Sequence, residues 1–504
     1  MNGRYAIILG LLGLVLGPSA SAMIPAEVEV ESGRIQGTAG RSPDVRVFKG
    51  VPFAAPPVGE NRWRPPQPVP PWEGVLPTHE FRPRCMQSRG GSDTAEDCLY
   101  LNVWTAADSA EDRLPVMVWI HGGALTGGSG SEARYDGEAL AGRGVVVVTI
   151  NYRLGPFGFF AHPELSAESP DGVSGNYGFM DALAALRWVR ANIAAFGGDP
   201  DNITVFGESA GGRMTGALAG SPAARGLLQR AIMQSGTWMG LVISRMPSLA
   251  EAEQAGADAA ARLGALSAAE LRALPAEEVL ANLPMSGIVV DGRLIPEDLS
   301  LTFAAGRQNA VDLLLGSNKD EGTFFITGPV RLEDFNRQAR DRFGELADQF
   351  LSLYPASSDA QAREAALTAY RDEVAWLKRT IAGWHTRAGH EAYAYYFTRV
   401  PPAPRPELGS THVAEIPYVF DHIPAGAPWE ESDARLAKTM AAYWVNFARN
   451  GDPNGPGLPE WAPYGGEEIV MELGETVAPM TQSVPSADAI RFFDAVFDQI
   501  VVGE

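Results

Sequence analysis

The feature that most constrains this fold is a serine, Ser209, framed by glycines where an expected strand meets an expected helix. The β-branched and aromatic residues 203–206 predict a buried strand, and the Ala/Leu-rich segment after Arg213 predicts a helix. The turn between them has the pattern Gly-x-Ser-x-Gly over residues 207–211. Because side chains at the flanking positions would clash with neighbouring backbone, the glycines allow a strained turn that exposes the serine hydroxyl. We therefore expect Ser209 to be a nucleophile, with helix N–H groups directed at a developing oxyanion.

The turn pattern needs partners before it indicates chemistry, because 55 glycines in 504 residues give such a match by chance roughly a third of the time. An acyl-transfer serine requires a base, a group that orients the base, and N–H donors for the oxyanion. A glycine-rich turn, residues 121–124, follows the short apolar run 118–120 upstream of the serine. Such turns supply N–H groups to an oxyanion, although a turn without chemistry is an equal alternative for this stretch alone.

The rest of the chain predicts an α/β fold. Short apolar runs bounded by turn residues suit strands buried on both faces of a sheet, and an amphipathic helix is expected over 181–194. Repeated strand and helix elements imply a large, mostly parallel central sheet with helices on both faces. The expected strands are 28–37, 45–51, 99–104, 116–120, 145–150, 203–206, 231–234, 311–315 and 393–398.

Two long stretches interrupt this alternation with helical composition. Residues 247–283 are rich in Ala, Glu and Leu without a strand pattern, and residues 332–388 form a second helical stretch. Both are expected to be helical insertions over the sheet. They either form the walls or lid of a site or add packing layers, and the sequence favours neither alternative.

The N-terminus has the pattern of a secretory signal peptide. One positive charge at Arg4 precedes the apolar run 6–16 and a small-residue cleavage site that ends at Ala22. About 11 apolar residues are too few to span a hydrocarbon core of ~30 Å, so we expect cleavage of residues 1–22 rather than a membrane anchor. The mature chain, residues 23–504, is then periplasmic or secreted, with no membrane span. The net charge of the full 504-residue sequence, -21, argues against nucleic acid as a partner.

The chain has two cysteines, Cys85 and Cys98, in a segment rich in Gly, Ser and Asp. In an exported protein two nearby cysteines usually form a disulfide. Two unrelated thiols are the alternative, whereas a metal site needs more ligands than two sulfurs.

Several motifs together make the sequence similar to the type-B carboxylesterases, the cholinesterase-like family of α/β hydrolases. The motifs lie at residues 48–54, 96–104, 151–155, 175–178 and 206–212, and the resemblance covers nearly the whole mature chain. It implies a single α/β-hydrolase domain over residues 23–504, with helical insertions over the active site.

The resemblance also implies the partners of Ser209. The acid would be Glu321, in the motif 318–322, and the base would be His412, in the motif 412–418. Their order along the chain is the nucleophile, acid, histidine order of α/β hydrolases. Asp320 remains a competitor for the acid, since the motif match alone decides against it. Other histidines compete for the base, namely His79, His121, His162, His385, His390 and His422.

By the same resemblance the oxyanion donors would be the amides of Gly123, Ala124 and Ala210. The commonest family pattern has a third glycine and an aromatic residue where Ala124 and Leu125 stand, which leaves the acyl preference open. Three further residues match supporting positions of the family. Ser235 would brace the acid, and Arg62 and Glu96 would form a buried ion pair at the base of the disulfide loop.

These inferences predict hydrolysis of a small-molecule carboxylic ester through an acyl-enzyme on Ser209, without a metal or an organic cofactor. An amidase, a carbamate hydrolase or a toxin-ester hydrolase of the same fold are alternatives, because they share the serine chemistry. A non-catalytic binding module of this family is the remaining alternative. Such modules typically lack a member of the triad, whereas this chain has all three residues. The sequence does not give the oligomeric state.

Overall fold

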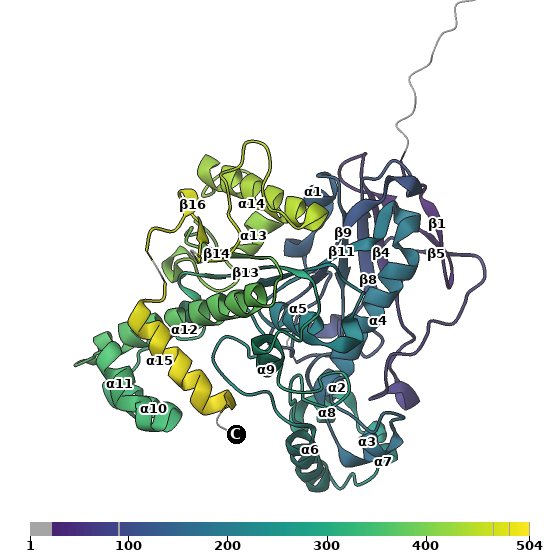
Figure 1. Cartoon of the computed structure of the whole chain (residues 1–504). Helices are drawn as coiled ribbons and strands as arrows, with labels where there is room; N and C mark the ends of the chain where they lie inside the picture. The colour runs from purple at the N-terminus through teal and green to yellow at the C-terminus, as the bar shows by residue number, and fades with distance from the viewer. Residues whose placement is uncertain (1–22, 89–90, 467, 483, 503–504) are drawn as a thin grey trace, which may run out of the picture.

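A computed structural model describes residues 23–88, 91–466, 468–482 and 484–502, so the expected signal peptide, residues 1–22, lies outside the described residues. Its centre is an 11-stranded sheet in the order β16-β15-β14-β13-β12-β11-β9-β10-β8-β4-β3 (Figure 1). The strands are β3 (Thr38–Ala39), β4 (Arg46–Pro52), β8 (Tyr100–Thr105), β9 (Leu114–Ile120), β10 (Val146–Ile150), β11 (Gly198–Glu208), β12 (Arg230–Gln234), β13 (Asp312–Asn318), β14 (Ala392–Phe397), β15 (Val470–Leu473) and β16 (Val477–Pro479).

Neighbouring strands from β15 through β13 and β11 to β10 pair in parallel, and antiparallel pairs occur at both ends of the sheet. The predicted α/β fold with a mostly parallel sheet is therefore confirmed. The helices are α1 (Glu138–Ala141), α2 (Gly155–Phe159), α3 (Pro163–Glu168), α4 (Tyr177–Asn192), α5 (Ala210–Gly220), α6 (Leu249–Leu263), α7 (Ala268–Ala273), α8 (Ala276–Asn282), α9 (Leu299–Ala304), α10 (Leu332–Phe343), α11 (Ala347–Leu353), α12 (Asp359–Arg387), α13 (Ile416–Val419), α14 (Glu431–Asn450) and α15 (Ala487–Phe497).

Helices cover both faces of the sheet because side chains alternate along each buried strand. On β9, Val118 packs in a cluster with Leu186 of α4 and Leu218 of α5. The next residue, Trp119, points to the other face, where it shares a cluster with Trp444 of α14. Figure 1 shows α14 on one side of the sheet and α4, α5 and α12 on the other.

The N-terminal segment differs from the sequence prediction. The single strand expected over 28–37 is a hairpin of β1 (Glu27–Val30) and β2 (Gly33–Gln36), which joins β5 (Val75–Pro77) in a separate three-stranded sheet. The chain reverses before Gly33, whose φ is 147°. A Cβ on Gly33 would lie 2.7 Å from the ring of Trp72, so only glycine leaves room for this contact.

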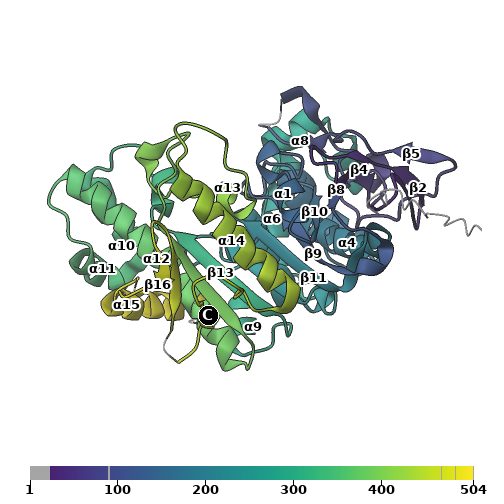
Figure 2. The same cartoon turned by 90° about the horizontal axis from the view of Figure 1, so that it is seen from above.

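Both expected insertions are helical. Helices α6 to α8 lie together at one end of the molecule, and α10 and α11 lie at the other (Figures 1 and 2). In contrast, α12 packs on β13 and β14, with Leu377 and Ile381 buried in the core. This part of the second insertion is therefore a packing layer. Within the described ranges, no helix combines the length and the apolar composition that crossing a membrane requires.

Candidate active site

Ser209 is the one residue between β11 and α5, at the carboxyl end of a central strand. Its φ of 57° and ψ of −119° lie outside the regions that non-glycine residues usually adopt. The amide of Ser209 donates to the carbonyl of Gln234 at 2.9 Å, which helps to hold this conformation. A Cβ on Gly211 would lie 1.9 Å from the carbonyl oxygen of Ile120, so the close approach of the turn to β9 requires glycine. The structure therefore has the strained turn that the sequence predicts.

The glycine-rich turn after β9 lies against the serine. A Cβ on Gly122 would lie 3.1 Å from the Cβ of Ser209. The next residues, Gly123 and Ala124, have positive φ values of 106° and 57°. Among the hydrogen bonds of the described residues, none uses the amides of Gly123, Ala124 or Ala210 as the donor. Within the described ranges, the three amides expected to bind an oxyanion are thus without an acceptor.

Glu321 and His412 are in direct contact at the ends of β13 and the loop after β14. Nδ1 of His412 lies 2.6 Å from one oxygen of Glu321, and the amide of Asn318 donates to the other oxygen at 2.9 Å. Asp320 points elsewhere and accepts a hydrogen bond from the amide of Ser410 at 2.9 Å. The geometry thus separates the two candidate acids, because only Glu321 contacts the imidazole.

The structure does not join Ser209 to His412 by a hydrogen bond. Nε2 of His412 lies 3.1 Å from a carboxylate oxygen of Glu208, the residue before the serine. Neither of these two atoms has a hydrogen-bond partner among the described residues. Catalytic hydrogen bonds are often long or poorly aligned before substrate binds. When the imidazole is neutral, Nε2 can therefore accept a proton.

Buried carboxylates determine the charge of this site. Glu208, Glu321 and Glu415 are each no more than 1% exposed, and all three act on His412. Burial by itself would lower the pKa of His412, but the three carboxylates raise it to about 9. Burial also raises the pKa of Glu208 to about 8, against the opposing effect of His412. Glu208 therefore takes up a proton more readily than an ordinary glutamate, and His412 holds its proton more tightly than an ordinary histidine.

Two aromatic side chains that the sequence analysis missed lie beside the imidazole. The ring centroids of Phe324 and Phe325 are 5.5 Å and 5.1 Å from that of His412. Both rings are unusually exposed for phenylalanine, at 38% and 46%. The available cue was an adjacent pair of large apolar residues that begins two positions after Gly322, the end of the acidic motif.

Ser235 behaves differently from the expectation. It is fully buried, but its hydroxyl has no hydrogen-bond partner in the part of the chain that the structure describes. Both oxygens of Glu321 already accept a hydrogen bond, from Asn318 and His412. The carboxylate is therefore held without Ser235, and the expected bracing contact is absent.

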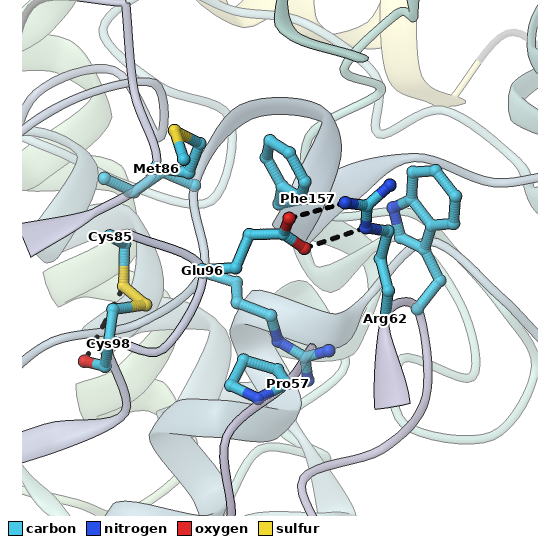
Figure 3. A pocket seen from close by; sticks show the side chains of 10 residues that line it. Pro57, Arg62, Cys85, Met86, Glu96, Cys98 and Phe157 are labelled. Carbon is cyan, nitrogen blue, oxygen red and sulfur yellow. Dashed lines mark hydrogen bonds and ion pairs between the residues drawn. A yellow bond between two sulfur atoms is a disulfide. The ribbon is translucent and has the colours of Figure 1, made fainter. Parts of the chain in front are cut away.

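The segment around the two cysteines agrees with the prediction. A disulfide joins Cys85 and Cys98, and Arg62 binds both carboxylate oxygens of Glu96, at 2.8 Å and 2.5 Å. Figure 3 shows Glu96 pointing at the Arg62 guanidinium, with Phe157 nearby and the disulfide on the other side of the pocket. This ion pair fixes the disulfide loop to the body of the protein. Residues 89 and 90 of the loop lie outside the described residues.

The described residues contain no group of three or more His, Cys, Asp or Glu side chains that could hold a metal ion. The polar groups at the site are a strained serine, a histidine in contact with a buried acid, and amides without an acceptor among the described residues, which are the groups that a serine hydrolase uses.

Comparisons with known proteins agree with this arrangement. The sequence model of the Carboxylesterase family matches residues 25–492. The fumonisin B1 esterase of Sphingopyxis macrogoltabida is 39% identical over 89% of this chain and 86% of that protein. The para-nitrobenzyl esterase of Bacillus subtilis (strain 168) is 36% identical over 87% of this chain and 92% of that protein. A solved structure of PNB esterase has a TM-score of 0.79 and 33% identity, covering 92% of this chain and 99% of that chain. The chain belongs to the type-B carboxylesterase family of α/β hydrolases and is a carboxylic ester hydrolase.

Proposed function

We propose that this protein hydrolyses carboxylic esters through an acyl-enzyme on Ser209, with His412 as the base and Glu321 as the acid that orients it. The observation that carries the proposal is the 2.6 Å contact between Nδ1 of His412 and Glu321, together with an Nε2 that has no hydrogen-bond partner among the described residues. This contact fixes the tautomer in which Nε2 can accept a proton, and Glu321 stabilises the imidazolium that forms.

The reaction proceeds in two halves. Nε2 of His412 takes the proton of Ser209 while the serine oxygen attacks the ester carbonyl, and the oxyanion lies on the amides of Gly123, Ala124 and Ala210. The alcohol leaves with the proton from His412. Water then attacks the acyl-serine with His412 as base, which releases the acid and restores the serine.

We also propose that the protein acts outside the cytoplasm after cleavage near Ala22. The pattern of residues 1–22 supports export. The disulfide between Cys85 and Cys98 supports it independently, because disulfides persist mainly in oxidising compartments. Mass spectrometry of the N-terminus of protein recovered from the periplasm or medium tests this, and an uncleaved cytoplasmic chain would contradict it.

Assays of the Ser209→Ala variant test the proposed reaction. A panel of p-nitrophenyl esters of graded acyl length, run beside the matching p-nitroanilides, should show esters as the better substrates. The variant should lose on the order of 10⁶ in kcat on every ester. Near-normal turnover by Ser209→Ala would overturn the proposal, and a preference for anilides would favour an amidase.

Fumonisin B1 is a second candidate substrate. The observation in its favour is the 39% identity to a fumonisin B1 esterase over 89% of this chain. Including fumonisin B1 in the same panel tests this candidate. If fumonisin B1 is the substrate, its kcat/KM should be at least as high as that of the best simple ester.

A further inference from the structure

One lysine is buried in the core, where lysines are rare. Lys378 of α12 is 3% exposed, and its Nζ donates to the carbonyl oxygens of Gly236 at 2.5 Å and of Met233 at 3.5 Å. Within the described ranges, no carboxylate lies within ion-pair distance of this amino group. Burying an amine without a carboxylate partner costs free energy, so these two carbonyl contacts need an explanation beyond packing.

Lys378 binds the two ends of a strained turn. Met233 lies in β12 and Gly236 lies just beyond this strand, and between them Ser235 has a φ of 46°. A non-glycine residue in this left-handed region persists only where its surroundings hold it there. The amide of Ser235 donates to the carbonyl of Gly316 at 2.9 Å, but its hydroxyl has no partner among the described residues. Lys378 therefore supplies side-chain hydrogen bonds that hold the turn.

The same turn lies against the backbone of the nucleophile. The amide of Ser209 donates to the carbonyl of Gln234, at the end of β12, at 2.9 Å. A Cβ on Gly236 would lie 2.0 Å from the carbonyl oxygen of Ser209, so the two backbones approach too closely for any side chain between them. Ser209 is thus packed on the turn that Lys378 holds, and a shift of this turn would move the serine.

The contacts of Lys378 do not depend on its charge. Burial lowers the pKa of Lys378 to about 7, against the opposing effects of the carboxylates of Glu321, Glu415 and Glu208. An ammonium group has three N–H donors and a neutral amine has two, so both forms can donate to both carbonyls. Lys378 has largely lost its proton before His412, whose pKa is about 9, begins to titrate. The turn is therefore held throughout the pH range in which the base becomes neutral.

We propose that Lys378 is a positioning residue for the nucleophile: it holds the turn after β12, and this turn holds Ser209 in the orientation that attacks the ester. This inference rests on the proposed reaction at Ser209. Because Lys378 is enclosed in the core, it acts through the backbone of residues 233–236 rather than on the substrate. A displacement of about 1 Å at a reacting group can lower a rate by about 10²-fold, so the loss of this support should be measurable.

The test measures how fast Ser209 attacks a fluorophosphonate, and separates the maximal rate constant of inactivation from the half-saturating concentration. Lys378→Met keeps most of the side-chain volume and removes the N–H donors. It should lower the maximal rate constant, and kcat/KM for a p-nitrophenyl ester, by about 10–100-fold, with the half-saturating concentration within about threefold of the wild type. Lys378→Arg, which keeps N–H donors, should recover part of this loss. The control is Lys438→Met, which changes an exposed lysine of α14 and should leave both rates unchanged.

Unchanged phosphonylation in Lys378→Met would overturn the inference and leave the proposed reaction intact. Ester hydrolysis retained by Ser209→Ala would instead overturn the proposed reaction. The loss in Lys378→Met should be the same at every pH, because a displaced serine reacts slowly whatever the charge of the base. A loss confined to pH values below the pKa of His412, about 9, would mean that Lys378 acts through that pKa, and would overturn the inference.

A second variant decides if Lys378→Met does not fold. Lys378→Gln keeps an N–H donor on a side chain that is one bond shorter, so it should fold but not reach both carbonyls. Its maximal rate of phosphonylation should then be lower than that of the wild type, and a wild-type rate would overturn the inference. Loss of the fold in both variants would show that Lys378 serves stability alone, which would also overturn it.

Discussion

Replacing Glu208 by glutamine should move the pH dependence of catalysis to lower pH. Glu208→Gln keeps the shape of the side chain and removes a negative charge 3.1 Å from Nε2 of His412. Carboxylates raise the pKa of His412 to about 9, and the imidazole must be neutral to take the proton of Ser209. Activity therefore rises with pH through this pKa. Without the charge of Glu208 the imidazolium is less stable, so the pKa of His412 falls. The acidic limb of the pH profile then moves to lower pH.

The size of the shift follows from the distance. Opposite charges within about 4–6 Å shift a pKa by roughly 1–3 units, each worth about 1.4 kcal/mol. Burial raises the pKa of Glu208 itself to about 8, so this carboxylate is mostly ionised near pH 9, where His412 titrates. We therefore expect the acidic limb of kcat/KM to move down by about 1–3 pH units.

The assay is kcat/KM for a neutral p-nitrophenyl ester from pH 5 to pH 10, since this quantity reports the titration of the free enzyme. The control is Glu270→Gln, which changes an exposed glutamate in the capping box of α7 and should leave the profile in place. An acidic limb that stays in place or moves up in Glu208→Gln would refute the reasoning.

The remaining predictions concern four other positions. Glu321→Gln should lower kcat by about 10³–10⁴, because only Glu321 contacts the imidazole. Asp320→Asn should lower kcat far less, since Asp320 binds the amide of Ser410 instead. If steady-state kinetics gave the reverse ranking, the acid would be misassigned. Ser235→Ala should change kcat by less than about threefold, because its hydroxyl has no partner in the part of the chain that the structure describes; a hundredfold loss would show that Ser235 does brace the acid. Cys98→Ser should destabilise the protein by about 3 kcal/mol in denaturant unfolding, since the disulfide to Cys85 closes a short loop; unchanged stability would mean that the disulfide contributes nothing.

Much of this molecule is predictable from its sequence because the relevant patterns are local. The run before Ser209 and the glycines around it predict a strand, a strained turn and a helix, and the structure has all three. The sequence analysis missed the hairpin at residues 27–36 because its reversal depends on a residue far away in sequence. That residue is Trp72, whose ring packs against Gly33.

The electrostatics of the site could not be predicted in the same way. Glu208 and His412 come from separate motifs, and Glu208 acts on His412 only because of the order in the sheet of the strands that precede these two residues. Among the described residues, the Nε of Arg213 is enclosed without a hydrogen-bond partner, which is likewise a property of its tertiary surroundings. Composition suggests the opposite, because a chain with net charge -21 offers acidic partners in abundance.

The most direct test of the central claim is to locate the covalent intermediate. The folded protein would be inactivated with a fluorophosphonate, and the modified residue identified by peptide mass spectrometry. We predict one phosphonate per chain, on Ser209, with loss of activity in proportion to labelling. Complete labelling of Ser209 without loss of ester hydrolysis, or inactivation through another residue, would contradict the claim that this serine carries the acyl group.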